Sequence, residues 1–139
     1  MRWPVTLAAG FVSLTALGAH TQGDPPQQAP RTVAVNVTCP RPGGNQQDAV
    51  QPWEVRLQVG DSLQWNLIEP ILSDTIEISL KETERRWPFA NPDRPRGRQL
   101  ARAHGARDRG RFAYNVTLRC PGPDGQPRLV VIDPEFIID

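Results

Sequence analysis

The stretch that decides the fold runs from Trp53 to Leu67 and reads WEVRLQVGDSLQWNL. Apolar and polar residues alternate in Trp53–Val59 and again in Ser62–Leu67, on either side of Gly60-Asp61. A period of two is typical of a strand with one buried face, and Gly-Asp is a turn signal. The sequence therefore predicts two strands joined by a hairpin, each with one face in a core.

The same alternation recurs along the chain. We expect further strands at Thr32–Cys39, Thr75–Leu80, Arg111–Leu118, Leu129–Ile132 and Glu135–Ile138. Pro40–Asp48 and Pro121–Pro127 are rich in turn residues. About seven or eight short strands separated by turns predict an all-β fold, a Greek-key β-sandwich.

One long segment breaks the alternation. Lys81–Gly110 carries several prolines and many arginines, and we expect a long basic loop there. Within it, Arg98–His104 is a candidate short helix, because Gly105 would suit the residue after a helix end.

Two of these strand segments resemble a known family. Val59–Trp65 (VGDSLQW) resembles the V-G-D-x-V-x-W strand pair of cupredoxins, and Gly110–Val116 (GRFAYNV) resembles their G-x-Y-x-Y-x-C strand. The resemblance covers about Thr32–Asp139 and implies a cupredoxin-like sandwich of the plastocyanin and azurin type. It also implies a copper-dependent electron carrier.

The copper ligands that the resemblance implies are missing. A blue-copper site takes two His, one Cys thiolate and usually an axial Met. The resemblance places the first His at Asp74 and the Cys at Val116, four residues before Cys120. The only His residues are His20 and His104, and the only Met is Met1. We therefore expect no metal site and no cofactor.

The N-terminus has the pattern of a secretion signal. Residues 1–19 combine a basic start at Arg2, a mostly apolar run and small residues at Gly18 and Ala19. The apolar run is shorter than the roughly 20 residues that span a membrane, and no later stretch is apolar enough. We expect cleavage after Ala19, a flexible Pro- and Gln-rich leader over residues 20–30, and one domain over residues 31–139, in the periplasm or outside the cell.

The two cysteines are Cys39 and Cys120. In an exported chain an even number of cysteines favours a disulfide. Two buried thiols or a metal site are the alternatives at this stage.

Charge is concentrated in the basic loop. Arg85–Arg111 holds nine arginines against Asp93 and Asp108, a local charge of +7 in a chain whose total is +1. One interpretation is an anion-binding surface formed by Arg94, Arg96, Arg98 and Arg102. The other is a covering loop whose Trp87 and Phe89 fill the core while its arginines pair with the chain's own carboxylates.

Several classes of function find little support. His104, the one His beyond the leader, lies in an Arg-rich segment, so no catalytic triad is indicated and we expect no enzyme. Export argues against nucleic acid as a partner, and an anionic envelope component or an acidic protein is the expected one. The leading interpretation is a cofactor-free domain with a binding or structural role in the bacterial cell envelope. The alternatives are an electron-transfer or copper-handling protein, and a hydrolase.

Overall fold

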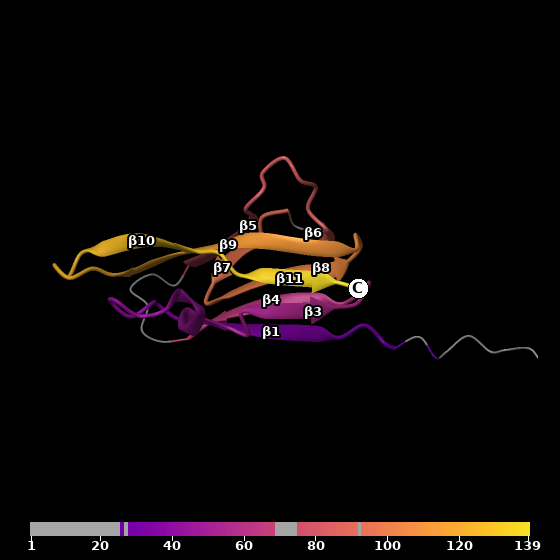
Figure 1. The fold of residues 1–139 in the computed structure, drawn as a ribbon, viewed down its shortest axis with the longest axis horizontal. Helices are drawn as coiled ribbons and strands as arrows, with labels where there is room; N and C mark the ends of the chain where they lie inside the picture. The colour runs from indigo at the N-terminus through magenta and orange to yellow at the C-terminus, as the bar shows by residue number, and fades with distance from the viewer. Residues whose placement is uncertain (1–25, 27, 69–74, 92) are drawn as a thin grey trace, which may run out of the picture.

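A computed structural model describes residues 26, 28–68, 75–91 and 93–139, which form eleven strands and one 3₁₀ helix (Figure 1). The elements are β1 (Thr32–Val37), η1 (Gln46–Ala49), β2 (Val50–Gln51), β3 (Glu54–Leu57), β4 (Ser62–Leu67), β5 (Thr75–Leu80), β6 (Phe89–Asn91), β7 (Arg96–Arg98), β8 (Leu100–Ala106), β9 (Gly110–Pro121), β10 (Pro127–Ile132) and β11 (Glu135–Ile138).

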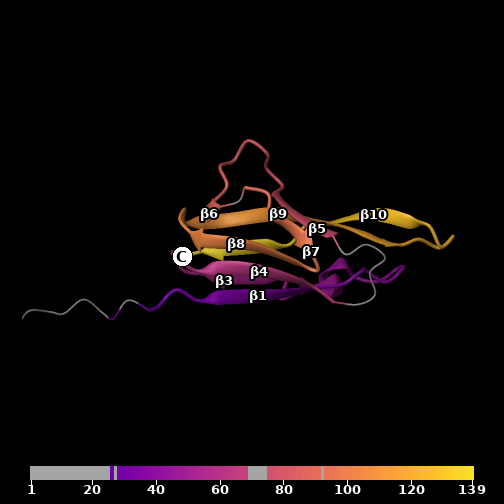
Figure 2. The same cartoon turned by 180° about the vertical axis from the view of Figure 1, so that it is seen from behind.

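The strands form two sheets (Figures 1 and 2). The first has the order β2-β1-β4-β8-β6, and the second has the order β3-β11-β9-β5-β7 with β10 paired to β9. Each sheet contains one parallel pair, β1 with β4 and β3 with β11. Those pairs join strands that are distant in the chain, so each sheet depends on long-range contacts.

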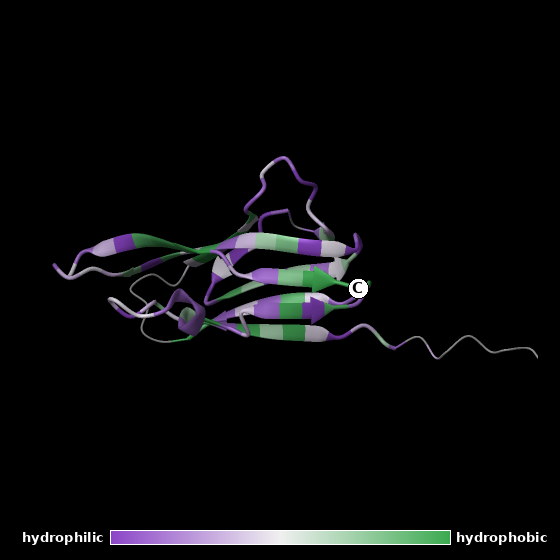
Figure 3. Ribbon diagram, in the orientation of Figure 1, coloured by the Kyte–Doolittle hydropathy of each residue, from purple (hydrophilic) through white to green (hydrophobic). Residues whose placement is uncertain are grey.

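The core lies between the sheets because most strands turn an apolar face inward. Figure 3 shows the resulting alternation of hydrophobic and hydrophilic positions along the strands. Aromatic rings link the two layers: Trp65 of the first sheet lies 5.6 Å from Tyr114 of the second, centroid to centroid. Phe89 and Phe136 make a similar contact at 5.3 Å. The all-β sandwich that the sequence predicts is confirmed.

The segment around Gly60-Asp61 differs from the expected hairpin. β3 pairs with β11 in the second sheet, whereas β4 pairs with β1 and β8 in the first. The turn thus carries the chain from one layer to the other. The buried residues of both strands still point into the same core, which explains why alternation alone suggested a hairpin.

The candidate helix at Arg98–His104 is wrong, and so is the single long loop around it. The segment contributes β6, β7 and β8, and β8 pairs with β4 through its residues 100–103. Ala101 lies opposite Trp65 in that ladder, and both are buried. The small alanine leaves room for the large indole, so tertiary packing overrides the helix preference of alanine.

A bulge ends the regular pairing of β8. Leu63 lies opposite Ala103, while Ala106 N donates to Asp61 O, so β8 uses one residue more than β4 over this interval. Gly105 has a φ of +62°, which glycine adopts without strain. Gly105, which was expected to follow a helix end, therefore lies at the bulge in strand β8.

Most of the other predicted strands are confirmed. β4, β5 and β11 have the predicted bounds, and β1, β3, β9 and β10 overlap the predicted segments. The expected signal segment, residues 1–19, and most of the leader lie outside the described residues. No helix in the described part of the chain is long and apolar enough to cross a membrane.

Candidate functional site

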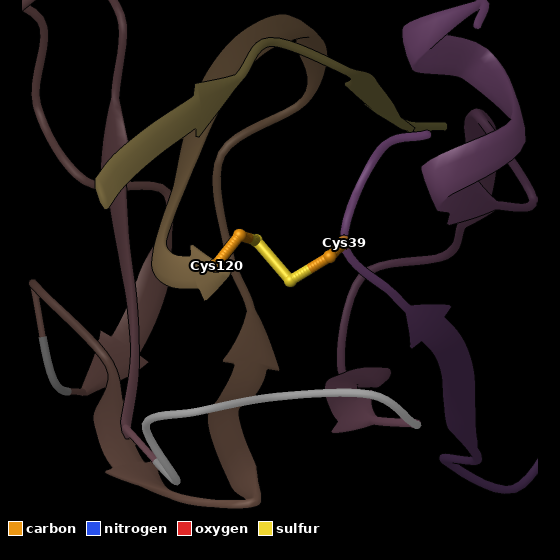
Figure 4. The surroundings of a disulfide bond; sticks show 2 residues. All are labelled: Cys39 and Cys120. Atoms are coloured by element: carbon orange, nitrogen blue, oxygen red, sulfur yellow. A yellow bond between two sulfur atoms is a disulfide. The ribbon is translucent and has the colours of Figure 1, made fainter. Parts of the chain in front are cut away.

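A disulfide joins the two layers of the sandwich. Cys39 follows β1 in the first sheet and Cys120 lies near the end of β9 in the second, with their Cα atoms 5.7 Å apart (Figure 4). Cys120 is buried, and Cys39 packs against the core. The pairing is that of the predicted disulfide, and the alternatives of free thiols and a thiolate metal ligand are set aside.

The thiolate position that the family resemblance assigns to copper does not fit a copper ion. Val116 is fully buried and lies opposite Ile78 in the β5–β9 ladder, so apolar side chains occupy this part of the core. The sulfur of Cys120 is bonded to that of Cys39 and offers no thiolate. Asp74 lies outside the described residues.

His104 adds nothing to such a site. Its side chain is exposed, on a strand of the first sheet whose inward residues are alanines, whereas Cys120 belongs to the second sheet. Among the residues that the structure describes, no group of three or more His, Cys, Asp or Glu side chains is placed to hold a metal ion.

Asp61 of the Gly-Asp turn has a structural role. Its carboxylate is buried and accepts hydrogen bonds from Gln58 N, Arg31 N and Arg31 Nε at 3.0–3.1 Å. Burial alone raises the pKa of Asp61, but the hydrogen bonds from Gln58 and Arg31 and the charge of Arg31 outweigh it, so the pKa lies below its ordinary value. The turn thereby fixes the segment that enters β1.

Of the four arginines of the predicted anion-binding surface, three lie on strands of the two sheets and one lies in a loop. Arg96 and Arg98 lie on β7 at the edge of the second sheet, and Arg96 Nε lies 3.8 Å from Glu77 Oε2. Arg102 lies on β8 in the first sheet and donates to Gln64 Oε1 at 2.6 Å. Arg94 precedes β7. Anion binding by these four arginines stays a prediction.

Other arginines of the segment pair with the chain's own carboxylates, as the covering-loop interpretation expects. Arg111 Nη1 donates to Glu54 Oε2 at 2.9 Å and also to Glu135, which ties β9 to β3 and β11. Arg86 Nε lies 3.9 Å from Asp108 Oδ2. These exposed pairs contribute little stability each, but they neutralise part of the local charge.

The aromatic residues of the segment face the core. Phe89 is buried against Phe136, and the Trp87 ring lies 5.3 Å from Phe89 and 6.4 Å from Phe136, centroid to centroid. They anchor the β5–β6 loop to the sandwich.

A small pocket lies between this loop and the loop that precedes β7. Its lining includes Arg94 from the predicted set, together with Ser79, Thr83, Arg85 and Arg86, which the sequence pattern does not mark as a site. The adjacency of Arg85 and Arg86 was visible, but nothing in the sequence places Ser79 or Arg94 beside them.

No protein-family model matches the chain, and no curated protein matches it. Among solved structures, the chain is similar to a mutant of amicyanin in its reduced Cu(I) form at pH 4, with a TM-score of 0.41 and 11% sequence identity. The alignment covers 78% of this chain and 82% of that chain. A likeness at this level carries no argument about the site, and the copper remains a property of amicyanin.

The fold and the bond between its layers define the class: a two-sheet β-sandwich with an intersheet disulfide.

Proposed function

We propose that this chain is an exported, cofactor-free, cupredoxin-like domain with a binding or structural role in the bacterial cell envelope. In this proposal residues 1–19 are a signal peptide, residues 20–30 a leader and residues 31–139 the domain. The domain is not an enzyme, and its partner is an anionic envelope component or an acidic protein.

The observation that carries the proposal is the disulfide between Cys39 and Cys120. Structural disulfides persist in oxidising compartments and are rare where thiols are kept reduced. The bond closes a long stretch of chain and links the two sheets. Because it persists in an oxidising compartment, it stabilises the fold most reliably outside the cytoplasm. This agrees with the signal pattern at the N-terminus.

The absence of a copper function is supported by the donors in the chain. Val116 brings an apolar side chain where the family resemblance expects a thiolate, and Cys120 is committed to a disulfide. His20 and His104 are the only imidazoles in the sequence. A site that needs two His and a thiolate cannot be assembled from one such chain.

Export is tested by producing the full chain in a bacterial host beside a matched variant with Leu14→Arg, which interrupts the apolar run. The expected result is that the full chain is recovered from the periplasm with His20 as its first residue and no titratable thiol. The variant should remain uncleaved in the cytoplasm. Recovery of the full chain from the cytoplasm with Met1 intact would overturn the proposal.

The copper alternative is tested separately by adding one equivalent of Cu(II) to the purified chain. We expect a colourless protein from which gel filtration removes the metal. An intense blue colour and one retained copper ion per chain would favour the electron-transfer alternative instead.

A further inference from the structure

A pocket of about 280 Å³ opens beside the end of β5. The β5–β6 loop forms one wall, and the loop that precedes β7 forms the other. Figures 1 and 2 show the β5–β6 loop standing above the sandwich. The lining residues are Ser79, Leu80, Thr83, Arg85, Arg86, Trp87, Asp93 and Arg94.

The side chains around this pocket are mostly hydrogen-bond donors. The lining residues include three arginines, Arg85, Arg86 and Arg94, and one carboxylate residue, Asp93, so the lining carries a formal charge of +2. Ser79 and Thr83 add hydroxyl groups that donate or accept. Like charges gathered at one place repel each other, and a bound anion relieves that repulsion.

Arg85 is held in position before any ligand arrives. Its Nη1 donates to Arg111 O at 2.6 Å, and its guanidinium lies 3.9 Å from the centre of the Phe112 ring. A guanidinium fixed by its neighbours loses little side-chain freedom when it binds an anion.

The other two arginines retain donors for a ligand. Arg86 makes only the long contact to Asp108, at 3.9 Å, in the described part of the chain. Within the same residues, Arg94 has neither an ion pair nor a hydrogen bond. Of the four arginines predicted to bind anions, Arg94 therefore has the most unpaired donors, and Arg94 is the one that lines the pocket.

Trp87 also lines the pocket and carries a donor without a partner. Its ring packs on Phe89 and Phe136, and its buried indole Nε1 has no acceptor among the described residues. Buried polar groups in native proteins usually have a partner.

We propose that this pocket binds a tetrahedral oxyanion, the phosphate or sulfate group of an anionic envelope component. The proposal rests on the binding role proposed above and names its ligand class. Guanidinium groups that reach the pocket from two loops suit an anion with three or four oxygens better than a planar carboxylate with two. The volume lies just below the range of pockets for drug-sized ligands, so one anionic group with its ester carbon is a suitable occupant.

The test is a titration of the purified, ¹⁵N-labelled chain, followed by amide, indole and arginine Nε resonances at constant ionic strength. The probes are inorganic phosphate, inorganic sulfate and glycerol 3-phosphate, with acetate as the planar anion. We expect saturable shifts at Trp87 and Arg94 with the tetrahedral anions and only small, linear shifts with acetate. Stronger binding of glycerol 3-phosphate than of phosphate and sulfate would assign the site to phosphate esters.

Two variants of equal charge change separate the pocket from the general field of the protein. Arg94→Gln should weaken phosphate binding about threefold to tenfold, the range expected for one exposed charge-assisted contact. Arg128→Gln, on the exposed strand β10, should leave it unchanged. Both variants are checked for an intact fold by their amide spectra.

Linear shifts with every probe, or equal weakening by Arg94→Gln and Arg128→Gln, would overturn the pocket proposal. Such a result would leave the export experiment untouched, because cleavage and thiol content are measured independently. Conversely, a chain that stays in the cytoplasm but binds phosphate saturably at Arg94 would refute the envelope role and keep the site.

Discussion

Removing the disulfide should lower the free energy of unfolding by about 4.5 kcal/mol. The perturbation is the double variant Cys39→Ala with Cys120→Ala, compared with the oxidised parent. Both side chains become small and apolar, so neither leaves a buried polar group without a partner.

The magnitude follows from the length of chain that the bond closes. The two cysteines are 81 residues apart in sequence. In the chain-entropy model the bond removes about 15 cal/mol/K from the unfolded ensemble for a loop of that length, which gives about 4.5 kcal/mol at 25 °C. Small domains have only about 5–15 kcal/mol in total, so the sandwich without its disulfide should be marginally stable.

The assay is equilibrium unfolding in urea, followed by tryptophan fluorescence, on four samples. These are the oxidised parent, the parent kept reduced with dithiothreitol, and the double variant with and without the reductant. We expect the reduced parent and the variant to unfold at similar, much lower urea concentrations. The variant should not respond to the reductant, which serves as the control for other effects of dithiothreitol.

Two results would refute this reasoning. A parent whose unfolding midpoint is the same with and without reductant would show that the bond is absent or contributes nothing. A double variant as stable as the oxidised parent would show that the two sheets need no covalent link.

Three further predictions concern single residues. Asp61→Asn should cost about 1–3 kcal/mol in urea unfolding, because an amide donor replaces an accepting oxygen. The pKa of Asp61 is lowered in the folded state, so its charged carboxylate stabilises the fold above about pH 4, and this stabilisation is lost as the pH falls through that pKa. The free energy of unfolding should therefore fall less steeply in acid for the variant than for the parent. Tyr114→Phe should also cost about 1–3 kcal/mol in urea unfolding, because Trp65 Nε1 loses its acceptor at 3.1 Å. In the parent, burial raises the pKa of Tyr114, so phenolate absorbance should appear only as alkali unfolds the protein. Gly97→Ala should cost about 1–3 kcal/mol in thermal denaturation, because an added Cβ would lie 2.0 Å from Leu100 O, and an unchanged midpoint would contradict this close approach.

The sequence was sufficient for the class of fold because most of its strands bury one face. β4, β5 and β11 have the bounds that alternation predicts. Alternation reports which side chains point inward, but it does not report the strand's neighbours. The turn at Gly60-Asp61 therefore looked like a hairpin, although hydrogen bonding places β3 and β4 in different sheets.

The segment with β6, β7 and β8 was misjudged for a different reason. Its inward residues Ala101 and Ala103 are small, and alanine has the highest helix propensity. Their role depends on Trp65, which lies opposite Ala101 and fills the space that the alanine leaves. Local sequence does not contain that information.

The candidate sites divide in the same way. The disulfide was predictable from two cysteines and a signal pattern. The basic pocket was not, because it needs Arg85 and Arg94 from separate loops beside Ser79 of β5. The density of arginines in the sequence indicated the basic segment. Only the fold shows that Arg94 lines the pocket, whereas Arg102 lies on a strand of the first sheet.

The measurement that tests the central claim most directly is a native mass spectrum of the chain isolated from the envelope fraction of a bacterial host grown with added copper. We predict a single species with the mass of residues 20–139 less two hydrogens, which reports cleavage after Ala19, a formed disulfide and no bound metal at once. A species that retains residues 1–19, keeps two free thiols or carries one copper ion would contradict the account.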